Sequence, residues 1–132
     1  MNRRGFLRAA VAAGLALVGR DPGRAQMLSD KEDTAEALIR VALREHRVLE
    51  FQYHGHARRT EPHALGRVRD GRPALLAWQA AGSSRSEPPP GWRTFLLTEI
   101  DNPGTGPEKF SPRPDYRPEK TRFKEILAEV AP

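Results

Sequence analysis

Apolar and polar residues repeat with two different periods along this chain, and the change of period predicts its elements. The first period, with steps of three and four residues, joins Ala35, Leu38, Ile39, Ala42 and Leu43. It predicts an amphipathic helix over about residues 30–46 with one apolar stripe. Ser29 and Glu32 have the spacing of a capping box, which marks the start of such a helix.

After this helix the period changes to two, which predicts strands with one buried face. Leu49, Phe51 and Tyr53 alternate with polar residues and form the first expected strand. A tight turn is expected at residues 54–56, because Gly55 tolerates the backbone angles that such turns require.

A hairpin is predicted next. Residues 58–69 form its first strand, which is interrupted or bent at Pro62 because proline cannot donate to a strand ladder. Asp70 and Gly71 are typical turn residues, and residues 74–78 form the returning strand.

The last third of the chain combines proline-rich connections with two further elements. Residues 81–91 predict an exposed loop, and residues 92–100 predict a strand that ends at 101–104. After a proline-rich connector, helical spacing returns at Phe123, Ile126, Leu127 and Val130. We therefore expect a mainly β (α+β) domain: a small antiparallel β-barrel between an N-terminal helix and a short C-terminal helix.

The first 25 residues have the order of an export signal, with charged, apolar and small-residue regions. Arg3-Arg4 followed by Phe6-Leu7 resembles the twin-arginine signal family. The apolar run of residues 9–18 is shorter than the roughly 20 residues of a spanning helix. Cleavage after Ala25 would leave residues 26–132 as one exported, periplasmic domain. A misassigned start, which would leave the protein in the cytoplasm, is the alternative.

The charge and the cysteine content of the chain argue against several classes of function. The formal net charge is +5, but residues 1–25 contain five arginines and one aspartate, so residues 26–132 are close to neutral. This argues against a uniformly basic nucleic-acid-binding surface. The chain has no cysteine, which excludes disulfides, thiolate nucleophiles and cysteine zinc sites.

Arginine is nevertheless concentrated on the predicted strands. Such side chains bind phosphates through charge-assisted, often bidentate contacts, and neighbouring aromatic rings can stack on bases. The candidate ligand-binding residues are Tyr53, Arg58, Arg59, Arg67, Arg69, Trp78 and Arg93. Two plainer interpretations stay open, in which the arginines form a solvated strand face and the aromatic residues pack in the core.

Other chemistry has less support in the sequence. His54 and His56 are separated by one residue, as ligands on one strand face would be, and His63 follows, but no carboxylate has clear ligand spacing. The serines at 83, 84 and 86 have no glycine-flanked elbow and no evident base. We therefore expect no catalytic residues, no metal site and no cofactor.

Several short motifs resemble the WYL domain family, in particular its short stand-alone members. They are Glu61-Pro62-His63-x-Leu65-Gly66, Gly91-Trp92-Arg93-Thr94-Phe95 and the tail over residues 112–118. The resemblance implies an Sm-like, SH3-type barrel that senses ligands or binds nucleic acid without catalysis. In that family, basic and aromatic side chains on the barrel are thought to contact nucleotide-like ligands.

The chain departs from the family at two places. The tripeptide that names the family aligns with Pro73-Ala74-Leu75, and Glu99 stands where a basic residue is usual. The predicted function is the binding of a nucleotide, an oligonucleotide or another anionic ligand. The alternative is an exported module that docks on an envelope protein through its proline-rich loop and barrel edge.

Overall fold

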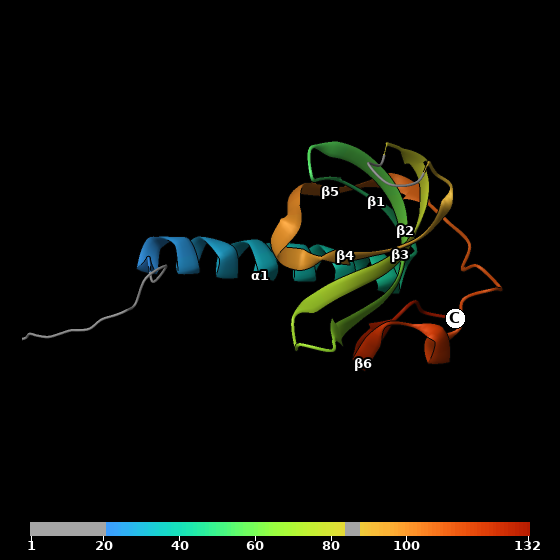
Figure 1. The fold of residues 1–132 in the computed structure, drawn as a ribbon. Coiled ribbons are helices and arrows are strands. Elements are labelled where there is room, and N and C mark those ends of the chain that lie inside the picture. The colour runs from blue at the N-terminus through green and yellow to red at the C-terminus, as the bar shows by residue number, and fades with distance from the viewer. Residues whose placement is uncertain (1–20, 84–87) are drawn as a thin grey trace, which may run out of the picture.

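One helix followed by six strands makes up the fold in the parts of the chain that the structure describes (Figure 1). The structure is a computed structural model, and it describes residues 21–83 and 88–132. The predicted twin-arginine motif and apolar run lie outside these residues. Within them, no helix is both long and apolar enough to cross a lipid bilayer.

The helix α1 (Pro22–Glu45) confirms the predicted N-terminal helix but begins earlier than expected. Its N-cap is Asp21, whose Oδ1 accepts a hydrogen bond from the Gly23 amide at 2.9 Å. The Ser29 capping box is therefore wrong, and the predicted cleavage point after Ala25 lies inside α1. Only the second half of the helix is buried, at Ala35, Ile39, Ala42 and Leu43.

Four strands follow in simple antiparallel sequence, which confirms the two predicted hairpins. They are β1 (Arg47–Tyr53), β2 (His56–Val68), β3 (Pro73–Gly82) and β4 (Gly91–Leu96). The predicted bend in β2 is present, because the pairing of β2 with β3 shifts register between Pro62 and Ala64. Proline removes one ladder donor at this point.

The strand predicted over residues 92–100 is divided, and a strand was missed after it. A short 3-10 helix, η1 (Leu97–Glu99), separates β4 from β5 (Ile100–Lys109), which returns to pair with β1. Pro103 and Pro107 led us to expect a connector here. Proline is tolerated in β5 because this strand lies at an edge of the sheet.

The sheet is open, so the predicted closed barrel is wrong. Its strand order is β4-β3-β2-β1-β5, which leaves β4 and β5 as the two ends of the path. The predicted C-terminal helix is also wrong, because this segment forms the strand β6 (Phe123–Glu129), which pairs with β2.

Two contacts explain why this segment is extended. β1 pairs only with the first half of β2, so the edge at Ala64–Val68 is available to β6. The ring of Phe123 packs against Gly66, where an added Cβ would lie 2.5 Å from the ring. The extended form therefore pairs the backbone of both strands and packs the half-buried Phe123 ring against β2.

Side chains from α1 and from one face of the sheet form a single core. Its members are Ala35, Ile39, Leu43, Leu49, Phe51, Tyr53, Leu65, Leu75, Ala77, Phe95, Leu97 and Ile100. We call the sheet face that carries these residues the inner face and the opposite one the outer face.

Candidate ligand-binding site

Arg58 lies on the inner face of β2, because it pairs with the core residue Phe51 on β1. Only 5% of this arginine is exposed. Its Nη1 donates to Oε1 of Gln79 at 3.1 Å, and its Nη2 donates to the carbonyl of Tyr53 at 3.1 Å. Both acceptors are neutral, and the buried Nε has no hydrogen-bond partner among residues 21–83 and 88–132.

Aromatic rings pack around this guanidinium group. Its central carbon lies 5.6 Å from the ring centre of Tyr53 and 5.7 Å from that of Phe95. These distances allow cation–π attraction, which partly offsets the loss of water around the charge. The rings of Tyr53 and Phe95 meet edge to face at 5.0 Å, so the surroundings of Arg58 are rigid.

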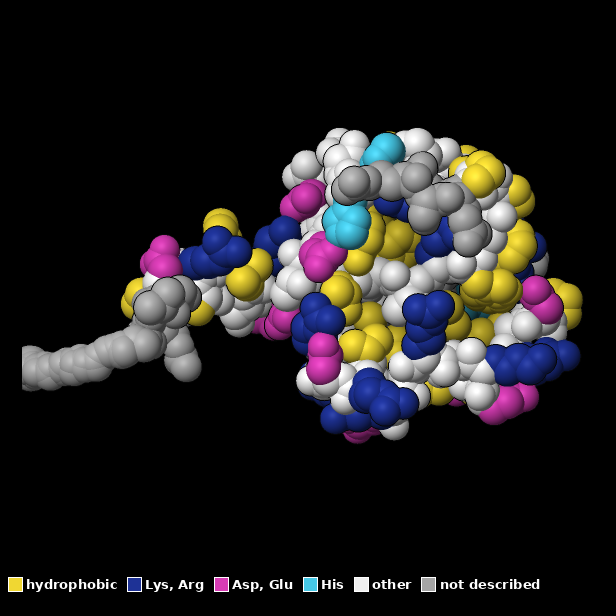
Figure 2. Space-filling model, viewed as in Figure 1, with side chains coloured by type: hydrophobic (Ala, Val, Ile, Leu, Met, Phe, Trp, Pro, Cys, Tyr) yellow, Lys and Arg dark blue, Asp and Glu magenta, His cyan; other side chains and the backbone are white. Residues whose placement is uncertain are grey.

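A second arginine reaches the same region from β4. Arg93 pairs with the core residue Ala77 and donates from Nη2 to the carbonyl of Pro88 at 3.4 Å. Burial, and after it the positive charge of Arg93, lower the pKa of Arg58 below its ordinary value. On the face shown in Figure 2, hydrophobic and basic side chains lie next to each other near the middle of the molecule.

Gln79 connects this arginine to the loop after β3. It is completely buried, and its Nε2 donates to the carbonyls of Ala81 and Ser83 at 3.3 and 3.2 Å. The inner cluster is the name we give to Tyr53, Arg58, Gln79, Arg93 and Phe95. It joins three of the seven predicted site residues, Tyr53, Arg58 and Arg93.

Tyr53 carries a second polar contact beside the cluster. Its hydroxyl accepts a hydrogen bond from the Leu96 amide at 3.0 Å, and burial raises its pKa. His54 stacks on the Tyr53 ring at 4.2 Å and bonds through Nε2 to Glu99. Glu99 therefore has a cation partner whenever His54 is protonated.

The structure places Trp78 and Arg59 away from the inner cluster. Trp78 lies on the outer face, where the guanidinium of Arg113 stacks over its ring at 4.1 Å. Arg59 forms ion pairs with Glu50 and Glu108. The positive charge of Arg59 is thereby neutralised by carboxylates of the protein itself.

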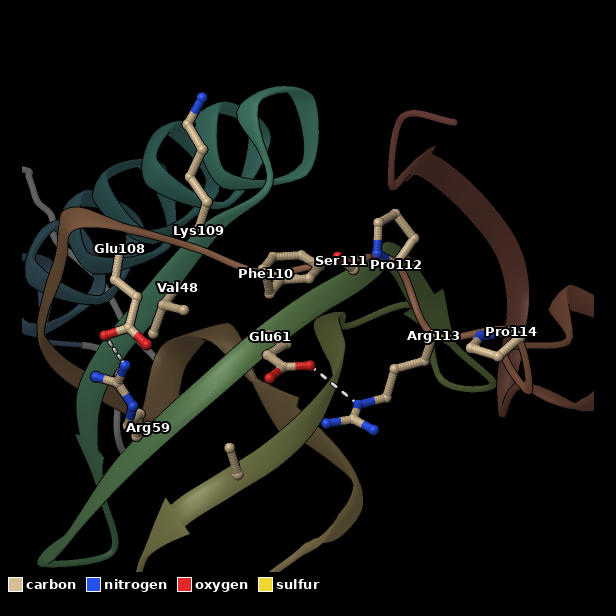
Figure 3. Close-up of a pocket in the computed structure, with 11 residues that line it drawn as sticks. Val48, Arg59, Glu61, Glu108, Lys109, Phe110, Ser111, Pro112, Arg113 and Pro114 are labelled. Atoms are coloured by element: carbon tan, nitrogen blue, oxygen red, sulfur yellow. Dashed lines mark hydrogen bonds and ion pairs between the residues drawn. The ribbon is translucent and has the colours of Figure 1, made fainter.

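Arg59 lines a groove of about 420 Å³ on this outer side, formed by β2 and residues 108–114. Figure 3 shows its two ion pairs, Arg59 with Glu108 and Glu61 with Arg113. Arg59 and Arg113 are already neutralised by these carboxylates, so we expect an anionic ligand to bind more weakly in this groove than at the inner cluster.

Arg67 and Arg69 lie at the far end of the β2–β3 hairpin, where both are exposed. Arg67 contacts Glu125 at 3.8 Å and the carbonyl of Gly71 at 3.1 Å. The prediction that one arginine face would unite all five arginines is therefore not supported, since they occupy three separate places.

The three histidines considered as metal ligands also have separate partners. His54 contacts Glu99, His56 contacts the hydroxyl of Ser83 at 2.9 Å, and His63 is buried beneath Arg113. In the described ranges, no three or more histidine, aspartate or glutamate side chains are placed to hold a metal ion.

Gln79 and Phe95 belong to the cluster, although neither was among the predicted site residues. A signal for the inward position of Arg58 was present, because a two-residue turn at His54-Gly55 pairs Tyr53 with His56 and hence Phe51 with Arg58. No comparable signal pointed to Gln79. Comparison with known proteins found no family, no curated protein and no solved structure that matches this chain.

Proposed function

We propose that this chain is a non-catalytic ligand-binding domain of WYL type, and that its inner cluster binds an anionic ligand such as a nucleotide or short oligonucleotide. One observation carries the proposal. The buried guanidinium of Arg58 is held by two neutral acceptors, and its Nε has no hydrogen-bond partner in the described parts of the chain.

The energetics of burial favour an anion at this place. A buried charge without an opposite charge is costly, and neutral hydrogen-bond acceptors compensate only part of that cost. The nearby charge of Arg93 adds to it, as the lowered pKa of Arg58 indicates. A phosphate or carboxylate beside Arg58 would offset the cost of burying this charge and the repulsion between Arg58 and Arg93. It would also accept charge-assisted hydrogen bonds.

The chain order supports the WYL-type assignment. A helix precedes four sequentially paired antiparallel strands, and β5 returns to β1 after the short helix η1. The sequence resemblance implies a small Sm-like or SH3-type arrangement, and the strand order agrees with a small antiparallel sheet that is open between β4 and β5. Its opening between β4 and β5 would give a ligand access to the inner face.

Binding measurements on the full chain would test the proposal, with adenosine monophosphate, a short oligothymidylate and inorganic phosphate as probes. We expect one of the two nucleotide probes to bind, with an affinity that falls as sodium chloride rises, because phosphate contacts release counterions. Arg58→Gln should abolish this binding. Arg69→Gln changes the same charge at an exposed position and should leave the affinity unchanged within about twofold.

A folding control is needed because Arg58 is buried. Arg58→Lys keeps the charge but loses the two-pronged hydrogen bonding, and we expect it to bind about tenfold or more weakly while its near-ultraviolet circular dichroism stays native. Equal binding by Arg58→Gln and the unaltered protein, or a loss in Arg69→Gln as large as in Arg58→Gln, would refute the proposal.

The alternative, an exported module that docks on an envelope protein, is favoured by α1. The first half of this helix extends away from the sheet, and Met27 on it is 58% exposed (Figure 1). N-terminal sequencing of the protein from each cell fraction separates the two functions. A periplasmic product that starts near Gln26 favours docking, whereas an intact cytoplasmic product favours a nucleotide ligand.

A further inference from the structure

A second basic groove lies on the outer side of the sheet, at β3, β4 and the segment before β6. Its volume is about 450 Å³, and it is lined by Leu76, Trp92, Arg93, Thr94, Lys120, Thr121 and Arg122. We call it the β4 groove. This volume is within the usual range for small-molecule sites, roughly 300–1,000 Å³.

Charge distinguishes the β4 groove from the other hollows of the described chain. Its lining contains three cationic residues and no carboxylate. The groove of Figure 3 contains Glu61 and Glu108, and those beside α1 and β5 contain Asp30, Asp101 or Glu50. Of these four hollows in the described residues, the β4 groove alone offers an anion the exposed cations Lys120 and Arg122 with no carboxylate in its lining.

The cations at its rim are held by local backbone structure. A short 3-10 helix, η2 (Pro118–Lys120), ends at Thr121, whose backbone is extended with φ −79° and ψ 164°. The Thr121 hydroxyl donates to the Pro118 carbonyl at 3.0 Å and accepts from the Phe123 amide at 3.4 Å. Lys120 and Arg122 stand on either side of this residue in the chain, and both line the groove.

Both rim cations are exposed, and within the described ranges neither forms an ion pair. Asp115 contacts the groove lining, since its Oδ2 accepts a hydrogen bond from Nε1 of Trp92 at 3.2 Å. That contact orients the indole ring, which meets Trp78 edge to face at 5.5 Å. The ring is therefore a fixed apolar wall beside two available positive charges.

We propose that the β4 groove binds an organic phosphate, with the phosphate on Lys120 and Arg122 and the apolar part of the ligand against Leu76 and Trp92. Arginine matches a phosphate with two parallel hydrogen bonds, and lysine adds a point charge. The Thr94 hydroxyl on the groove wall can add one further donor. Arg93 lines this groove and also belongs to the inner cluster, but the phosphate position proposed here uses Lys120 and Arg122 and not Arg58.

Amide chemical shifts of the full chain, followed during titration with phenyl phosphate, would test this site. We expect shifts at residues 92–94 and 120–122, and tighter binding of phenyl phosphate than of inorganic phosphate because of the apolar wall. Lys120→Gln combined with Arg122→Gln should weaken phenyl phosphate binding about tenfold or more, since two charge-assisted hydrogen bonds are lost.

Two controls keep the test specific. Arg69→Gln with Lys124→Gln removes the same charge outside the groove and should change the affinity less than about twofold. The amides of Arg58 and Gln79 should not shift during the titration, which separates this site from the inner cluster. Shifts centred elsewhere, equal affinity for both phosphates, or equal losses in the groove and control double variants would overturn the proposal.

Discussion

His63 accepts a hydrogen bond at Nε2 from the backbone amide of Arg113, with a nitrogen–nitrogen distance of 3.0 Å. Its Nδ1 lies 2.8 Å from the carbonyl oxygen of Glu61, so the ring donates there. These partners require a neutral ring with its proton on Nδ1. The contact fastens residues 110–117 to the outer face of the sheet.

The first prediction concerns acid stability. Burial lowers the pKa of His63 below its ordinary value of 6.5, so the unfolded chain binds this proton at higher pH than the folded chain does. The free energy of unfolding should therefore be steady above about pH 7 and fall as the pH drops from roughly 7 to 5. Urea unfolding at a series of pH values would measure this.

His63→Gln supplies the control for that experiment. It removes the titrating ring, so it should be less stable at neutral pH and much flatter between roughly pH 7 and 5. The exposed variant His54→Gln should keep the decline of the unaltered protein. An unchanged pH profile in His63→Gln would contradict our assignment of the decline to His63.

The second prediction concerns Arg113, which stacks over Trp78 at 4.1 Å and donates from Nε to Glu61 at 3.0 Å. Arg113→Ala should lower the free energy of unfolding by about 1–3 kcal/mol, because it removes the stacking and leaves Glu61 without its partner. Arg113→Lys should recover part of this loss. Arg69→Ala, at an exposed position, should cost less than about 0.5 kcal/mol.

The third prediction concerns the packing of β6 on β2. A methyl group at residue 66 would lie 2.5 Å from the Phe123 ring and 2.6 Å from the Glu125 carbonyl oxygen. Gly66→Ala should therefore destabilise the fold by about 1–3 kcal/mol and speed hydrogen exchange at the β6 amides. Gly104→Ala is the matched control, since no atom lies within 4 Å of its added Cβ. Equal effects of the two substitutions would show that β6 does not pack as described.

The fourth prediction concerns the two tyrosines of the chain. Burial raises the pKa of both, and for Tyr116 the hydrogen bond to Glu129 at 2.6 Å raises it further. The unfolded chain therefore loses these protons first, and stability should fall as the pH rises above the ordinary value of 10. Tyrosinate absorbance should appear together with unfolding, and early ionisation of the native protein would argue against this.

Much of the fold could be predicted because local signals agreed with it. The apolar stripe through Ala35 and Leu43 identified the buried half of α1, and the turns at Gly55 and Gly71 identified the hairpins. β6 could not be predicted, because Phe123 and Ile126 fit helical spacing equally well. This segment forms a strand because the unpaired edge of β2 is available to it, and that edge exists only once the sheet has assembled.

The candidate site was predictable only in part for a similar reason. Alternation along a strand shows which arginines share a face, and the two-residue turn at His54-Gly55 sets the pairing with β1 that directs Arg58 toward the core. The separation of Arg59 from Arg58 follows from the same pairing. The acidic partners of Arg59 come from distant residues, and no local pattern indicates them.

Along one of its edges β2 has two neighbours in turn, β1 beside its first half and β6 beside its second. The second neighbour is more than fifty residues further along the chain, so this edge stays unpaired until the segment of β6 has been synthesised. The unpaired backbone groups of this edge can pair with another strand, and during that interval the strand that pairs can come from a second molecule. The chain is therefore suited to exchange of its C-terminal strand between molecules, a domain swap in which each copy completes the sheet of the other.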